Sequence, residues 1–530
     1  ALGVDRSAYS ATATASAAAT LGGDFNVSSG SLISGEFETA IAEAIGVEQD
    51  VEAEGSAAAS IDASGNISVG ASSTALVGDN LDASSEAAGF DQDAYAEFGL
   101  ASVTLNSNAN VSVAATATAT GTDLSGDNDA NASAQGAIQY AESESAAASA
   151  TANNSGSLTV TADATAIASS GDGIGEADAD AFAGGIYQEV LAQTDATGLI
   201  VNSSSSSIDV TANATASATG EADASAIATG MDQEVRSASG NATATVTNSG
   251  SMTVTSVAQA DSEESIAEGY ADAVGIEQYA RSVDGDASGN IASNDLTVSA
   301  NASASGSSYA NAETWATGID QYIAANSGNA SGTITNTGTL DVDSVAVASA
   351  PSGFGEANAD ALAQGIGQSV SASALATGLI VNTSDSSIDV TASANAVGGS
   401  DGDANANASA LAVTQNVFSS DGNASGTVSS SGSISASATA DASSGEYAEA
   451  NASADGIVQT VTANSVNAAA AGTIDSGILS SYASANASGG SGLFEGGTAN
   501  ASAQGISQSV SADSGGSAQA SGNITSTTSL

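Results

Sequence analysis

The chain has 530 residues and a formal net charge of −57, because 60 acidic residues face only three arginines, and it contains no lysine, histidine or cysteine. This composition excludes a disulfide, a Ser-His-Asp triad, a zinc site of the usual kinds and a lysine Schiff base. The acidity argues against nucleic acid and anionic membrane surfaces as partners. No run of 18 apolar residues is present to span a membrane.

One four-residue pattern recurs along the whole chain: a glycine, an apolar residue, any residue and a glutamine. Its period is about 46 residues, which is typical of a repeat architecture. The glycine is replaced once, by Ala412. The glutamines of the repeat are Gln49, Gln92, Gln139, Gln188, Gln233, Gln278, Gln321, Gln368, Gln415, Gln459 and Gln508.

The composition alone would predict disorder, because large apolar residues are sparse and the net charge is high. The large apolar residues are not scattered, however, and lie at fixed offsets from the glutamines, as Ile366 and Val370 do around Gln368. A regular pattern of this kind predicts an ordered chain whose units are stabilised by stacking on one another.

Within each unit, in chain order, the first predicted element is a strand of alternating alanines and acids, such as Glu-Ala-Asp-Ala-Asp-Ala at 176–181. This alternation predicts a narrow core lined by alanine and an acidic exterior. The glycine of the four-residue pattern follows this strand, and it suits a bend between two strands.

After the bend, the pattern predicts a strand in which the glutamine and the apolar residues two places before and after it share one face. The amide would therefore be buried and would need hydrogen-bond partners. A third strand follows a turn of Asn, Gly and Ser, as at 248–254 and 336–342.

These elements predict an all-β fold, an elongated parallel β-solenoid of about eleven 46-residue units that forms one continuous domain over residues 1–530 without an internal linker. We expect two coils of about 23 residues per unit, which would give a rod roughly 105 Å long at about 4.8 Å per coil. The alternative is one large coil per unit. That version would halve the length and would stack the glutamines into a direct ladder.

Acid-rich turns and stacked acids make calcium the candidate ligand, since hard cations prefer several oxygen ligands. The alternative is a solvated acidic face that keeps the protein soluble. The candidate metal ligands are Asp127, Asp129, Asp172, Glu176, Asp178, Asp180, Asp401 and Asp403.

Strands with an apolar-x-Gln pattern and Asn/Gly/Ser turns, such as residues 185–190 and 505–510, resemble curlin-like amyloid repeats and the β-solenoid regions of haemagglutinin-like bacterial adhesins. The resemblance implies an extracellular fibre, a biofilm scaffold or an adhesive rod. Curlin-like units differ from the units of this chain in three ways. They are about half as long as the period of about 46 residues found here, they carry a second regular glutamine, and they usually have glycine where this chain has valine.

The expected function is that of an extracellular structural protein. The chain begins at Ala1, as a mature secreted protein does, and residues 522–530 match the opening of a unit at 332–340, so we expect uncapped solenoid ends that polymerise head to tail. Self is therefore the expected partner, with cell-surface glycans as a further candidate. The alternative is the stalk of a monomeric adhesin or surface-layer protein.

Catalysis is not expected. Two carboxylates could still hydrolyse a neutral glycan, so a glycan-cleaving β-helix enzyme is a third hypothesis. Trp315, the only tryptophan, lies in an ordinary unit, and we interpret it as a partly buried or surface residue rather than as a platform for a sugar.

Overall fold

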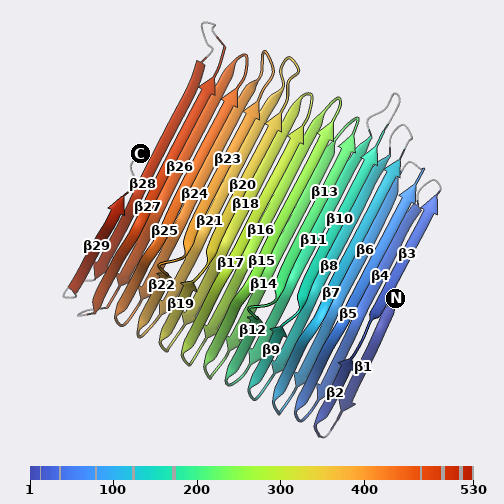
Figure 1. The fold of residues 1–530 in the computed structure, drawn as a ribbon, viewed down its shortest axis with the longest axis vertical. Helices are drawn as coiled ribbons and strands as arrows, with labels where there is room; N and C mark the ends of the chain where they lie inside the picture. Colours follow the sequence, from blue (N-terminus) through green and yellow to red (C-terminus); the bar gives the residue numbers. More distant parts are fainter. Residues whose placement is uncertain are drawn as a thin grey trace.

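The computed structural model describes residues 1–11, 13–34, 38–77, 80–121, 126–169, 175–465, 468–490, 496–512 and 517–527. These residues form 29 strands in two sheets whose strand pairs are all parallel, so the predicted all-β parallel solenoid is confirmed. Figure 1 views the resulting slab face-on, with the N-terminal strands at one side and the C-terminal strands at the other. No helix capable of crossing a membrane occurs among the described residues.

The two sheets differ in how their strands are divided. Sheet A has twelve strands: β1 (Leu2–Ser10), β4 (Glu38–Ala53), β6 (Leu81–Ala96), β8 (Asp127–Ser143), β11 (Glu176–Ala192), β14 (Ala222–Ser237), β16 (Ile266–Ser282), β18 (Tyr309–Ala325), β21 (Glu356–Ala372), β24 (Asp403–Ser419), β26 (Tyr447–Ala463) and β28 (Gly496–Ala512). Sheet B has seventeen: β2 (Ala15–Leu21), β3 (Phe25–Ser34), β5 (Ala57–Leu76), β7 (Ala101–Gly121), β9 (Ala148–Asn154), β10 (Ser157–Ala168), β12 (Ala196–Asn202), β13 (Ser207–Ala218), β15 (Ala242–Ser262), β17 (Ala287–Ser305), β19 (Ala330–Asn336), β20 (Thr339–Ser349), β22 (Ala376–Asn382), β23 (Ser387–Val397), β25 (Ala424–Ser443), β27 (Ala469–Ser488) and β29 (Ser517–Thr527).

Each unit makes one coil, and the expectation of two coils per unit is wrong. The chain runs along β11 in sheet A, returns through β12 and β13 in sheet B, and enters β14, which pairs with β11 so that Gln188 lies beside Gln233. Twelve strands at about 4.8 Å span about 53 Å, half the length that two coils per unit would give. The physical reason is that one long strand, rather than two short ones, covers each sheet-A layer.

The glycine of the pattern does not separate two strands. In β11 the buried and exposed positions alternate up to Gly185, but Gly185 and Ile186 are both buried, so the alternation shifts by one residue within a continuous strand. The register skips this place, pairing Gly184 with Thr229 and Ile186 with Met231. The glycines of successive coils lie close together: a Cβ built on Gly230 would meet the carbonyl oxygen of Gly275 at 2.5 Å. The glycine therefore permits a phase shift and close stacking.

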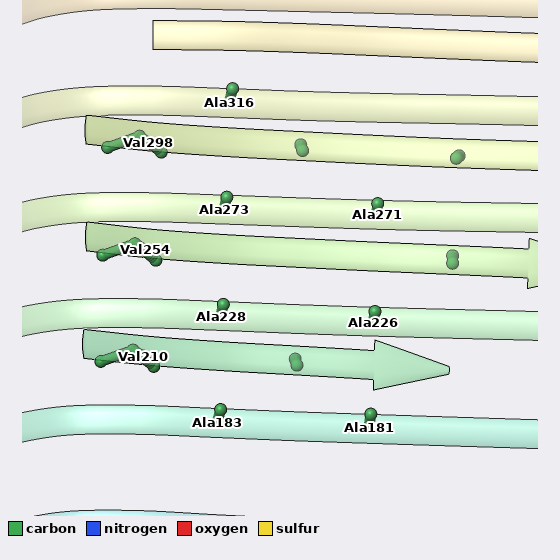
Figure 2. Close-up of a cluster of buried hydrophobic side chains, with 14 of the residues drawn as sticks. Ala181, Ala183, Val210, Ala226, Ala228, Val254, Ala271, Ala273, Val298 and Ala316 are labelled. Atoms are coloured by element: carbon green, nitrogen blue, oxygen red, sulfur yellow. The ribbon is translucent and has the colours of Figure 1, made fainter. Parts of the chain in front are cut away.

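The core lies between the sheets and is thin, as the alternation of alanine and acid predicts. Alanines of sheet A face valines of sheet B, with Ala226 and Ala228 opposite the row of Val210 and Val254 (Figure 2). Larger side chains such as Met231 fill the middle of the slab, where the phase shift occurs. Alanine on one side and branched residues on the other allow the two sheets to pack closely.

Candidate functional site

The glutamines of the repeat form one hydrogen-bonded ladder through the whole stack. From Gln92 onward, each side-chain Nε2 donates to the Oε1 of the glutamine in the preceding coil, at distances between 2.7 and 3.0 Å. From Gln49 to Gln459 these side chains are at most 2% exposed. The prediction of a buried amide is confirmed. The direct ladder of glutamines agrees with the alternative of one large coil per 46-residue unit.

The second N–H of each amide is satisfied across the slab. Gln233 donates to the backbone carbonyl of Thr245 in sheet B at 3.2 Å, and Gln278 donates to that of Asn290 at 3.3 Å. Several coils make room for the ladder with a sheet-B glycine: a Cβ on Gly332 would lie 2.7 Å from the Oε1 of Gln321. The ladder thus connects the two sheets as well as successive coils.

A second ladder, made of asparagines, was not predicted. Asn154 donates to Asn202 at 2.9 Å and Asn202 donates to Asn248 at 2.8 Å, while Asn336 donates to Asn382 at 2.9 Å. These side chains are buried, and their amides donate toward the following coil, opposite to the glutamines. The sequence pattern predicted such asparagines only in turns. A buried asparagine stands 14 or 15 residues after five of the eleven glutamines, and a buried serine takes that place after three others, which is the signal that could have identified them.

The candidate calcium ligands are not all brought together. Asp127 lies beside Glu176, and Asp129 beside Asp178, on the outer face of β8 and β11. Asp401 and Asp403 lie several coils away, at the start of β24. Asp172 lies outside the residues that the structure describes. Among the residues that the structure describes, no group of three or more acids is arranged to hold a metal ion.

The acids instead form rows along the outer face of sheet A. One row runs through Asp82, Asp129, Asp178, Asp223 and Glu268 in successive strands. Partial burial and the neighbouring carboxylates raise the pKa of Asp178 and that of Asp223 to about 6. The rows therefore store electrostatic repulsion at neutral pH.

A second row joins Asp232 of β14 to Glu277 of β16 and Asp320 of β18. Burial, followed by the charges of Glu277, Glu234 and nearby acids, raises the pKa of Asp232 to about 7. The pKa of Asp232 therefore lies near neutral pH, chiefly because the side chain is buried and secondly because of its acidic neighbours.

The two edges of the stack carry almost no charge. We call β1, β2 and β3 the N-terminal edge, and β28 and β29 the C-terminal edge. In these five strands the only charged residues are Asp5 and Arg6, which both lie in β1 and cancel. Arg6 takes the place of a ladder glutamine, opposite Gln49, and is exposed. Comparison of the chain with known protein families, with curated proteins and with solved structures finds no match.

The ladder predicts a large cost for removing one amide from its middle. In Gln278→Leu, the Oε1 of Gln233 loses its donor and the Nε2 of Gln321 loses its acceptor. Each buried orphaned group costs about 1–3 kcal/mol, so we expect the free energy of unfolding to fall by about 2–6 kcal/mol in a urea titration followed by circular dichroism.

The matched control is Gln259→Leu, which changes an exposed glutamine on the outer face of sheet B. This variant should stay within about 0.5 kcal/mol of the parent protein. Equal effects of the two substitutions would show that the ladder contributes nothing specific.

The acid rows predict that the protein becomes more stable on mild acidification. Because the pKa of Asp232 is raised from 3.8 to about 7 in the folded state, this carboxyl holds a proton that the unfolded chain releases between those values. Stability is therefore lost as the pH rises through this window. In thermal melts, Asp232→Asn should match the parent near pH 4 and exceed its melting temperature at pH 8. A difference that does not change with pH would contradict this explanation.

Proposed function

We propose that this chain is an extracellular structural protein whose copies stack head to tail into a surface filament or a biofilm-matrix fibre. The observation that carries the proposal is that both edges lack the charges that normally prevent edge-to-edge pairing of strands. In a molecule of net charge −57, nearly uncharged edges let two copies approach with little repulsion.

The register between coils suggests how the edges would meet. If β1 of one copy adds to β28 of another in the register that β1 has with β4, Arg6 comes beside Gln508. The Oε1 of Gln508 accepts no hydrogen bond from a further glutamine in the described part of the chain, and a guanidinium offers only donors. An arginine of one copy would thus extend the ladder of the next through a charge-assisted hydrogen bond.

Apolar side chains at the edges favour the same arrangement. Val4 and Phe25 at the N-terminal edge, and Ile506 and Val510 at the C-terminal edge, pack against the core but are only partly buried. Stacking would cover these side chains as their counterparts are covered inside the slab, where Val47 is fully buried. Burial of apolar surface would therefore add to the backbone hydrogen bonds between copies.

The acid rows have a separate role in this proposal. They keep filaments apart from one another and bind cations diffusely, with calcium as the candidate because a divalent ion offsets carboxylate repulsion more strongly than a monovalent one and calcium accepts several oxygen ligands. An exposed acidic slab of this kind suits a secreted, cell-surface location, as in the curlin-like and adhesin repeats that the sequence pattern resembles.

Electron microscopy of the purified protein in EDTA, and then in millimolar calcium, tests the proposal. We expect filaments whose axial repeat is roughly 58 Å, because each stacked copy adds twelve strand spacings of about 4.8 Å. Growth that needs calcium would assign a bridging role to the acid rows. Single slabs in both conditions would refute self-assembly and favour the stalk of an adhesin.

Charge reversal at the edge should weaken assembly specifically. In Arg6→Glu, a carboxylate would face the Oε1 of Gln508 in place of a donor, and the loss of a charge-assisted bond corresponds to at least about a tenfold rise in the concentration needed for filaments. Arg281→Glu makes the same change in net charge on the outer face of β16, away from both edges. Light scattering should find this control close to the parent protein. Equal losses in both variants would mean that net charge, and not the edge, governs association.

A further inference from the structure

The outer face of sheet A contains a groove that ends at the only tryptophan. It has a volume of about 420 Å³ and crosses β18, β21, β24, β26 and β28, which lie side by side in the sheet (Figure 1). Trp315 and Leu362 form one end, with 47% and 39% of their surfaces exposed. A groove of this volume is in the range of sites that hold small organic ligands.

The rest of the groove repeats one tripeptide three times. The segments Asn407-Ala408-Ser409, Asn451-Ala452-Ser453 and Asn500-Ala501-Ser502 lie in register in β24, β26 and β28. Their asparagines form one row along the groove and their serines a second row, two residues further along each strand. The same amide and hydroxyl therefore recur once per coil, at intervals of about 4.8 Å.

The asparagines are held in place by one another. Asn407 donates to Asp360 at 2.6 Å, Asn451 donates to Asn407 at 2.9 Å, and Asn500 donates to Asn451 at 2.9 Å. An amide has two N–H donors and an oxygen that can accept twice. Asn407 keeps one donor and one acceptor position for a ligand, whereas the second N–H of Asn451 is used by Glu449. The polar groups are thus fixed before any ligand arrives, which lowers the entropic cost of binding.

From this arrangement we propose that the groove binds a neutral, extended polysaccharide, with one sugar ring over the indole of Trp315 and the following rings along the Asn/Ser repeats. A row of identical subsites fits a ligand that itself repeats, and the coil spacing is close to the length of one pyranose ring in an extended glycan. The indole offers an apolar face to the C–H groups of the sugar, and the amides and serine hydroxyls bond its hydroxyl groups.

The charges favour a neutral glycan over an acidic one. Asp360, at the tryptophan end, is the only charged residue that lines the groove, and it would repel a uronate. Trp315 is partly exposed, as predicted from the sequence for a partly buried or surface residue, and its role as a platform for a sugar is what the proposal adds. The proposal does not depend on the stacking of copies, because the groove lies on the outer face and not on the backbone edge between coils.

Titration with cellohexaose tests this inference, with intrinsic fluorescence as the readout. Because Trp315 is the only tryptophan, its emission reports directly on occupancy of the groove. The protein should come from a host that does not glycosylate asparagine, since each repeated tripeptide is an Asn-x-Ser triplet. We expect saturable binding whose affinity rises from cellobiose to cellopentaose and then levels off, because five strands line the groove.

Variants measured by calorimetry separate this site from non-specific contact. Trp315→Ala should lose about tenfold or more in affinity, and Asn407→Leu should weaken binding as well. Asn153→Leu is the matched control, because Asn153 belongs to a similar outer ladder on sheet B, where it donates to Asn106 at 2.9 Å. It should bind as the parent does.

Three results would overturn the proposal: no fluorescence change with cellohexaose or xylohexaose, equal affinity for hexagalacturonate, or unchanged affinity in Trp315→Ala. Arg6→Glu, which should remain dispersed, is expected to bind the sugar normally. Failure of filament formation and failure of glycan binding are therefore separate outcomes.

Discussion

The buried amide of the repeat glutamine is the constraint on which the rest of the slab depends. An amide surrounded by valine and alanine must satisfy two donors and an oxygen, and water cannot reach it. The coil does so in only one way: one N–H goes to the preceding glutamine and the other to a carbonyl of the facing sheet. This requirement fixes the register between coils and the distance between sheets at once. A slip of one residue would move every glutamine to the outer face and orphan its partners.

The thin alanine core follows from the same distance. A sheet-B carbonyl can be reached by a glutamine side chain only where the sheets are close, and alanine and glycine keep them close. Gly378 lies against two ladder amides, where a Cβ would be 2.8 Å from the Oε1 of Gln368. The low content of large apolar residues, which by itself would predict disorder, is therefore compatible with order. Hydrogen bonds between identical units and many small contacts replace a bulky core.

The sequence predicted the strands, their inner faces and the buried glutamine, because period-two alternation and fixed offsets depend on local geometry. The sequence pattern did not determine the number of coils per unit. Alternation on both sides of Gly185 is the same whether the chain bends there or shifts phase within one strand. The burial of Gly185 together with Ile186 distinguishes the two, and burial depends on the neighbouring coil. The groove at Trp315 was missed for a related reason: its residues are up to 187 positions apart in the sequence, from Trp315 to Ser502, and only the register unites them.

Charge is distributed unevenly along the slab, and the distribution bears on function more than on stability. In the row that contains Asp178 and Asp223, neighbouring carboxylates repel one another, whereas later in the same row Asn405 donates to Asn358 at 2.9 Å. Amides in register stabilise the stack and carboxylates in register weaken it, yet the fold accepts both at equivalent places. The acids of β8 to β18 are therefore not required by the architecture. In the proposed filament these acids would repel neighbouring copies or hold cations, while the groove-lining segments of β24, β26 and β28 carry no charged residue and leave a surface that a neutral partner can approach. One fold thus carries two kinds of surface, and the exchange of Asp for Asn at fixed positions in the coil is enough to convert one into the other.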